Sequence, residues 1–131
     1  MKLTFLALAL LLAQVPKHDP NGVWVSESGA QYEIHQDGSN VQVKLVPGSN
    51  PKFLQYEVAL KNQEEVNTYK GTGSFTAKME GGKECKFTTD WMFIVVTPDR
   101  ILGSSTGVVA DSKTCAIKEK NQVQLDLKKK K

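Results

Sequence analysis

The chain has few of the side chains that catalyse reactions or bind metal ions. It contains two histidines and two cysteines among 131 residues. His18 lies in a proline-flanked segment and His35 on the polar side of an extended one, so neither has a nucleophile beside it. Metal sites usually need four ligands at close spacing, and neither cysteine has a histidine near it. The sequence therefore predicts no enzymatic activity, no catalytic residue, no metal site and no cofactor.

Helical periodicity is also missing, because no window of about twelve residues repeats its apolar positions at the helical period between capping residues. Short alternating segments with hairpin turns recur roughly every 8–12 residues instead, which is typical of sandwiches and barrels. Consecutive hairpins without a long return connection favour a meander, and closing it removes exposed strand edges. The prediction is an all-β domain over residues 21–127, a single up-and-down antiparallel β-barrel of about eight strands.

The clearest strands lie between residues 21 and 46. Tyr32 and Ile34 alternate with polar neighbours, and Asp37-Gly38 is a strong hairpin signal because its turn type requires positive φ. Two glycines on the inward face of 66–79 predict a bend or the close approach of another group. We expect strands over 22–27, 30–36, 40–46, 53–60, 66–79, 84–88, 91–97, 100 to about 109, 115–117 and around 123–127, with a turn at Thr89-Asp90.

Only one apolar run is long enough to suggest a targeting segment. It follows Lys2 and extends from Leu3 to Leu12, with the small residue Ala13 after it. Those are the parts of a secretory signal peptide, and the run is too short to span a bilayer. Residues 1–13 are therefore expected to be a signal peptide cleaved after Ala13, residues 14–20 a linker, and the protein secreted or periplasmic with no membrane span.

The two cysteines, Cys85 and Cys115, suit an exported chain, where an even count favours one disulfide. In the chain-entropy model such a bond stabilises the fold by roughly 3–4 kcal/mol. A pair of free thiols or of metal ligands is the competing interpretation.

Positive charge is concentrated at the C-terminus. The formal net charge is +3, but Lys128 to Lys131 account for it, and the body without them and Lys2 is slightly acidic. Such a basic tail is usually a solvated, disordered end, although it can also tether a protein to an anionic surface. No aromatic residues interleave with the lysines, so nucleic acid is not an expected partner.

Aromatic residues are predicted on the inward faces of the strands. Tyr32, Tyr56, Tyr69 and Phe75 can pack as a core or line a pocket for a small ligand. Trp24, on the first strand, is expected to be structural and to plug one end of the barrel. The apolar run from Trp91 to Thr97 predicts a strand buried on both faces, or one whose outer face meets a partner.

Two short motifs resemble those of the calycins, the superfamily of lipocalins, fatty-acid-binding proteins and avidins. Gly22-Val23-Trp24 is similar to the G-x-W motif of the first strand. Thr89-Asp90-Trp91 resembles the T-D-Y motif between the sixth and seventh strands, with a structural Trp91 in place of tyrosine. The resemblance implies that a basic residue packs over Trp24, with Lys128 as first candidate and Arg100 as second. The spacing of Trp24, Gly29 and Ile34 also resembles the opening of avidins, but the later paired tryptophans that bind biotin are not recognisable.

Two functions follow as expectations. The first is an exported lipocalin-like barrel that binds a small apolar or amphipathic ligand through Tyr32, Tyr56, Tyr69 and Phe75. The alternative is a solid barrel that acts by its surface, as a hydrolase inhibitor or a protein-interaction module, through the loop over 47–51 or the linker before Asn21. The sequence predicts neither the ligand nor the oligomeric state.

Overall fold

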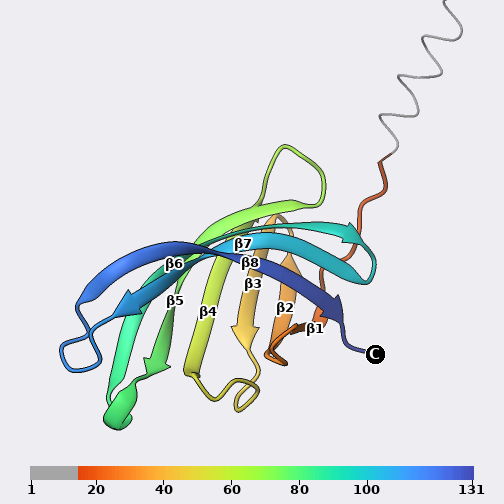
Figure 1. Cartoon of the computed structure of the whole chain (residues 1–131). Coiled ribbons are helices and arrows are strands. Elements are labelled where there is room, and N and C mark those ends of the chain that lie inside the picture. Colours follow the sequence, from red (N-terminus) through yellow and green to blue (C-terminus); the bar gives the residue numbers. More distant parts are fainter. Residues whose placement is uncertain (1–14) are drawn as a thin grey trace, which may run out of the picture.

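The protein is a closed, all-antiparallel, up-and-down β-barrel of eight strands (Figure 1). The computed structural model describes residues 15–131, so the predicted signal peptide lies outside the described residues. Each strand pairs with the next one, and β8 pairs with β1 through Trp24 opposite Lys129. The predicted fold class is confirmed. The strands are β1 (Gly22–Ser26), β2 (Gln31–Asp37), β3 (Asn40–Leu45), β4 (Phe53–Asn62), β5 (Thr68–Lys78), β6 (Glu84–Thr97), β7 (Arg100–Ala110) and β8 (Ile117–Lys129).

A short 3₁₀ turn, η1 (Glu80–Gly82), connects β5 and β6. Among residues 15–131 there is no helix with the length and apolar character needed to cross a bilayer.

The predicted turn at Thr89-Asp90 is wrong, because β6 runs unbroken from Glu84 to Thr97. Buried and exposed residues alternate from Glu84 to Val96, and Thr89 takes an inward position. Its hydroxyl donates a hydrogen bond to the Thr106 carbonyl oxygen at 3.0 Å, which satisfies the buried polar group. The Thr89-Asp90-Trp91 motif therefore lies inside a strand and not between two strands.

The C-terminal region also differs from the prediction. Cys115 has a left-handed φ of 63° and lies in a loop, so the short strand expected over 115–117 is wrong. The last strand is a single element from Ile117 to Lys129. The first part of this strand is exposed on both faces and polar, so its sequence lacks the apolar alternation that predicts a strand.

The glycines of β5 are confirmed as positions of close approach. A Cβ atom on Gly71 would lie 1.9 Å from the Ala59 carbonyl oxygen, and one on Gly73 would lie 2.0 Å from that of Glu57. Both contacts are with the backbone of β4, so only glycine fits there.

The apolar run of β6 is buried on its inner face alone. Trp91, Phe93 and Val95 are at most 1% exposed. Its outward residues Met92 and Ile94 are each 36% exposed, so a strand buried on both faces is excluded.

One end of the barrel, the closed end, is filled by Trp24 and Tyr69, which are both 0% exposed. The Trp24 indole N–H donates to the Pro20 carbonyl oxygen at 2.9 Å. The ring of Tyr69 packs against Phe93, with centroids 5.2 Å apart, and its hydroxyl accepts a hydrogen bond from the Gln36 side chain at 3.1 Å. The predicted structural role of Trp24 at one end of the barrel agrees with this packing.

The basic residue over Trp24 is Lys129, one residue beyond the predicted Lys128. The Lys129 ammonium lies 5.6 Å from the centre of the indole ring, whereas Lys128 is exposed. The second candidate, Arg100, instead pairs with Asp126. Strand alternation explains the difference, because Lys129 is directly opposite Trp24 while Lys128 is opposite Val25.

The lysine run is not a separate tail. Lys128 and Lys129 belong to β8, and the amide of Lys129 donates to the Asp99 carbonyl oxygen at 2.9 Å. The amide of Lys130 donates to the Val23 carbonyl oxygen at 2.8 Å. The barrel therefore extends into the segment that composition suggested was disordered.

Candidate functional site: the cavity at the open end

The opposite end of the barrel, the open end, contains a cavity of about 1030 Å³. The loops β1–β2, β3–β4, β5–β6 and β7–β8 surround this end, away from the C-terminus (Figure 1). Ligand sites in proteins are clefts of roughly 300–1,000 Å³, so the cavity is large enough for a small organic molecule.

Six aromatic rings form one wall of this cavity. Tyr56 stacks on Phe75, with ring centroids 5.0 Å apart and an angle of 12° between the ring planes. Tyr32 meets the edges of Tyr56 and Trp91 at 5.9 and 5.6 Å. These contacts lock the rings in place, and such edge and stacked geometries are favourable beyond the area they bury. The wall consists of Tyr32, Phe53, Tyr56, Phe75, Phe87 and Trp91.

The opposite wall is a two-stranded ribbon, residues 106–124, formed by the end of β7 and the start of β8. The β6–β7 pairing stops at Trp91 and Ser105, and the β8–β1 pairing stops at Leu127 and Ser26. Beyond those points the two ribbon strands pair only with each other. Val108, Ala110 and Val123 of the ribbon line the cavity. The ribbon therefore covers the cavity as a flap whose two edges have no ladder of backbone hydrogen bonds to β6 or β1, although the Thr89 side chain of β6 bonds to the Thr106 carbonyl oxygen.

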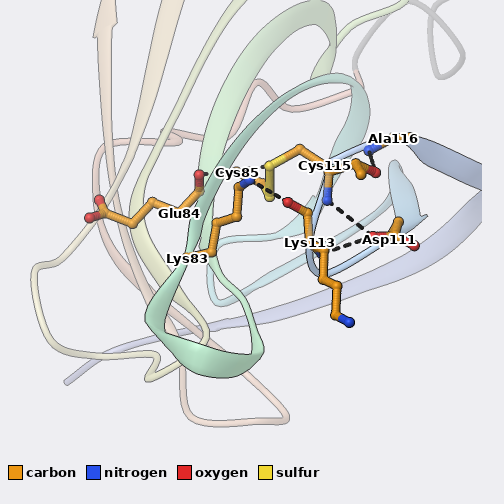
Figure 2. The surroundings of a disulfide bond; sticks show 8 residues. Lys83, Glu84, Cys85, Asp111, Lys113, Cys115 and Ala116 are labelled. Atoms are coloured by element: carbon orange, nitrogen blue, oxygen red, sulfur yellow. Dashed lines mark hydrogen bonds between the residues drawn. A yellow bond between two sulfur atoms is a disulfide. The ribbon is translucent and has the colours of Figure 1, made fainter.

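The tip of the ribbon is tied to the barrel by the disulfide between Cys85 and Cys115 (Figure 2). The two Cα atoms are 5.5 Å apart, and the predicted pairing is confirmed. The Lys83 ammonium, just before β6, also donates to the Lys113 carbonyl oxygen in the loop between β7 and β8. The loop itself is folded around Asp111, whose carboxylate accepts from the amides of Lys113 and Thr114 and thereby has its pKa lowered.

Three hydroxyl groups line the interior near Trp91. The Tyr56 hydroxyl accepts a hydrogen bond from the Trp91 indole N–H at 2.9 Å. Tyr32 and Ser105 are 6% and 7% exposed, and within the described residues no hydrogen bond reaches either hydroxyl. Burial raises the pKa of Tyr32 far above its ordinary value, so its hydroxyl stays protonated even in moderately alkaline solution.

Charged side chains occur at the rim of the cavity and not at its base. Lys52, Lys78, Glu27 and Glu80 line it and are exposed, and the half-buried Asp126, which also lines it, is paired with Arg100. Among the residues described, no group of three or more His, Cys, Asp or Glu could hold a metal ion. The interior is thus apolar with a few neutral hydroxyls, which suits binding through burial and hydrogen bonds.

Three of the four residues predicted to bind a ligand lie together in this cavity: Tyr32, Tyr56 and Phe75. Tyr69 does not, because it fills the closed end. Ser105 and two phenylalanines, Phe53 and Phe87, were missed, and Trp91 was expected to be structural only. The inward alternation of β6 could have identified Phe87, which lies on the same face as Cys85.

No family model, curated protein or solved structure matches this chain. The resemblance to calycins is therefore limited to the short motifs around Trp24 and Trp91. The fold itself, a small closed eight-stranded barrel with a cavity at one end, is established by the strand pairing.

Proposed function

We propose that this protein is an exported, calycin-like barrel that binds a small apolar or amphipathic ligand in the cavity at its open end. The observation that carries the proposal is the cavity of about 1030 Å³ against an ordered aromatic wall. The disulfide is consistent with an oxidising compartment, which supports export.

Apolar burial would supply most of the binding free energy. Each 100 Å² of apolar ligand surface removed from water contributes about 2.5 kcal/mol, before the cost of association. Because the rings of Tyr56, Phe75 and Trp91 are already fixed by mutual contacts, little side-chain entropy would be lost on binding. We propose binding without chemical conversion, since the lining has neither a histidine nor a free cysteine.

The test is titration with N-phenyl-1-naphthylamine, a neutral dye whose emission rises in apolar surroundings. A filling variant, Ala77→Phe, places a ring in the cavity that Ala77 lines. The matched control, Ala59→Phe, makes the same change at an exposed position on β4. We expect saturable dye binding in the wild type and the control, and at least a tenfold loss in Ala77→Phe, about 1.4 kcal/mol. No saturable binding by the wild type would refute the proposal.

The alternative function is inhibition of a hydrolase by a loop or by the N-terminal linker, and the contacts of the linker give its part in this little support. The linker is held against the barrel by Asn67, whose side chain accepts from the His18 amide at 2.7 Å and donates to the Pro16 carbonyl oxygen at 2.9 Å. Pro20 is buried beneath Trp24. Because these backbone groups of the linker already bond to the barrel, few remain available to bind a partner protein.

A further inference from the structure

The cavity contains hydrogen-bond donors that the protein does not use. Tyr32 and Ser105 are both more than nine-tenths buried, and neither hydroxyl has a partner among residues 15–131. The Tyr56 hydroxyl accepts from Trp91, but its own proton has no acceptor there. No fully buried side-chain nitrogen or oxygen of the described residues lacks a partner, so the unpartnered hydroxyls of Tyr32 and Ser105 must be accessible from the cavity that both residues line.

The three hydroxyl-bearing side chains surround one indole ring. Tyr56 is bonded to the Trp91 nitrogen, the Tyr32 ring is 5.6 Å from the Trp91 ring, and Ser105 is directly opposite Trp91 on the neighbouring strand. These hydroxyl groups are thus gathered beside the aromatic wall, whereas other polar side chains of the lining, such as Asn121 and Gln124, belong to the ribbon. Buried groups of this kind orient a ligand, and they select for one that can bond to them.

The charge of these groups indicates the kind of ligand atom. All three are hydroxyl groups, which carry no charge at neutral pH, and the lysines that line the cavity are exposed at its rim. A carboxylate beside Trp91 would lose its hydration without gaining a cation, which is costly. A carbonyl oxygen is neutral and has two lone pairs, so it can accept from two hydroxyls.

We infer that the cavity binds ligands carrying a neutral carbonyl group, a ketone or an amide, and that this oxygen lies beside Trp91, where it accepts hydrogen bonds from the hydroxyls of Tyr32 and Ser105. The apolar part of the ligand extends along the aromatic wall toward the ribbon. This inference rests on the proposed function and names the ligand class of the same site.

Three naphthalenes of similar shape separate the contributions of the carbonyl group, apolar burial and negative charge to the affinity. 2-Acetylnaphthalene carries the ketone, 2-ethylnaphthalene lacks it, and 2-naphthoate replaces it with a carboxylate. Their affinities are measured by displacement of N-phenyl-1-naphthylamine at neutral pH. Because one net hydrogen bond is worth about a fivefold change in affinity, removing a donor should lower the affinity for the ketone and leave that for the hydrocarbon unchanged. The readout is the ratio of these two affinities.

We expect this ratio to fall about fivefold in Tyr32→Phe, and by a similar factor in Ser105→Ala. Tyr69→Phe is the matched control, since it removes a phenol hydroxyl at the closed end, and its ratio should equal that of the wild type. We expect 2-naphthoate to bind at least about tenfold more weakly than the ketone. In the infrared spectrum of wild-type complexes, the ketone C=O stretch should lie at a lower frequency than in hexane.

An unchanged ratio in both Tyr32→Phe and Ser105→Ala, or tightest binding of 2-naphthoate, would overturn the inference while dye binding still supported the proposed function. A ketone C=O stretch at the same frequency as in hexane would also overturn the inference. This measurement uses the wild-type protein, so it does not depend on the folding of a variant. If neither the dye nor any of the naphthalenes bound, the proposed function and this inference would both fail.

Discussion

The two ends of the barrel are built from the same kinds of residue and differ in how their polar groups are satisfied. Each has a buried tryptophan, Trp24 at the closed end and Trp91 at the open end, with 0% and 1% of their surfaces exposed. At the closed end, the Trp24 nitrogen donates to the backbone and the Tyr69 hydroxyl is bonded to Gln36. At the open end, the hydroxyls of Tyr32 and Ser105 face the cavity without a partner among the described residues.

The difference comes from the segments that lie at the two ends of the barrel. The linker places the Pro20 carbonyl oxygen at the Trp24 indole nitrogen, and the end of β8 places Lys129 over the ring, so the linker and the last residues of β8 fill that end. At the other end, the ribbon over residues 106–124 arches past the aromatic wall and leaves space beneath it. Strand alternation determines which side chains point into the barrel. The linker, the end of β8 and the ribbon determine whether the space around those side chains is filled.

The largest expected effect is on stability at the closed end. Trp24→Ala should lower the free energy of unfolding by about 3–5 kcal/mol, because it leaves a sealed cavity. Phe75→Ala should cost less, because Phe75 borders an existing cavity into which its space can merge. Urea denaturation of both variants measures the difference. A larger loss in Phe75→Ala would show that the open end carries more of the stability.

Removing the disulfide should have the next largest effect, and it should act on the ribbon first. The bond joins residues 30 positions apart, so its loss should destabilise the fold by about 3–4 kcal/mol. Hydrogen exchange of the wild type with and without reductant locates the change. We expect the amides of residues 106–124 to lose protection before those of β3 and β4. Uniform loss over all strands would contradict a separately tethered flap.

The tyrosines should differ in alkaline titration. Burial raises the pKa of Tyr32 above 10.0, its ordinary value, so the last phenolate to form in the folded protein should be that of Tyr32. Its folded pKa is above its unfolded one, so the folded state retains a proton that the unfolded state loses. Stability from this group should therefore fall as the pH rises above about 10.

Phenolate absorbance and urea denaturation across this pH range measure both effects. Tyr32→Phe should abolish the final titration step and flatten the alkaline loss of stability. Tyr69→Phe is the control and should leave the final step in place. If that step survived in Tyr32→Phe, the burial of Tyr32 would not be the cause.

The smallest expected effect concerns the cation over Trp24. Lys129→Gln removes an ammonium 5.6 Å from the indole centre, and a cation–π contact of this kind is worth about 0.5–1 kcal/mol. The neighbouring Lys128→Gln removes an exposed charge and should change stability much less. Thermal unfolding of the two variants makes the comparison, and equal effects would rule out a specific contact with Trp24.

Much of the fold could be predicted from local patterns. Alternation around Tyr32 and Ile34, the Asp37-Gly38 turn and the cysteine pair identified strands, a hairpin and the disulfide. The turn predicted at Thr89-Asp90 is wrong because the pairing of β6 with β5 and β7 overrides the local preference of these residues for a turn. The lysine run predicts a disordered tail, which is wrong because composition does not show that Lys129 pairs opposite Trp24 and closes the barrel.

The site could be predicted only in part. Alternation assigns Tyr32, Tyr56, Tyr69 and Phe75 to the inside but gives no depth along the barrel axis, so Tyr69 could not be separated from the others. Ser105 was missed because a serine beside a glycine-rich stretch carries no apolar signal. Its proximity to Trp91 arises from the register of β6 on β7, which local sequence patterns do not predict.

The most direct test follows the two indole N–H resonances of Trp24 and Trp91 in a nitrogen–proton correlation spectrum during titration with 2-acetylnaphthalene. The chain has two tryptophans, one at each end of the barrel. We expect the Trp91 resonance to shift with saturation while that of Trp24 stays in place. No shift at Trp91 under saturating ligand, or shifts confined to Trp24, would contradict a ligand site at the open end.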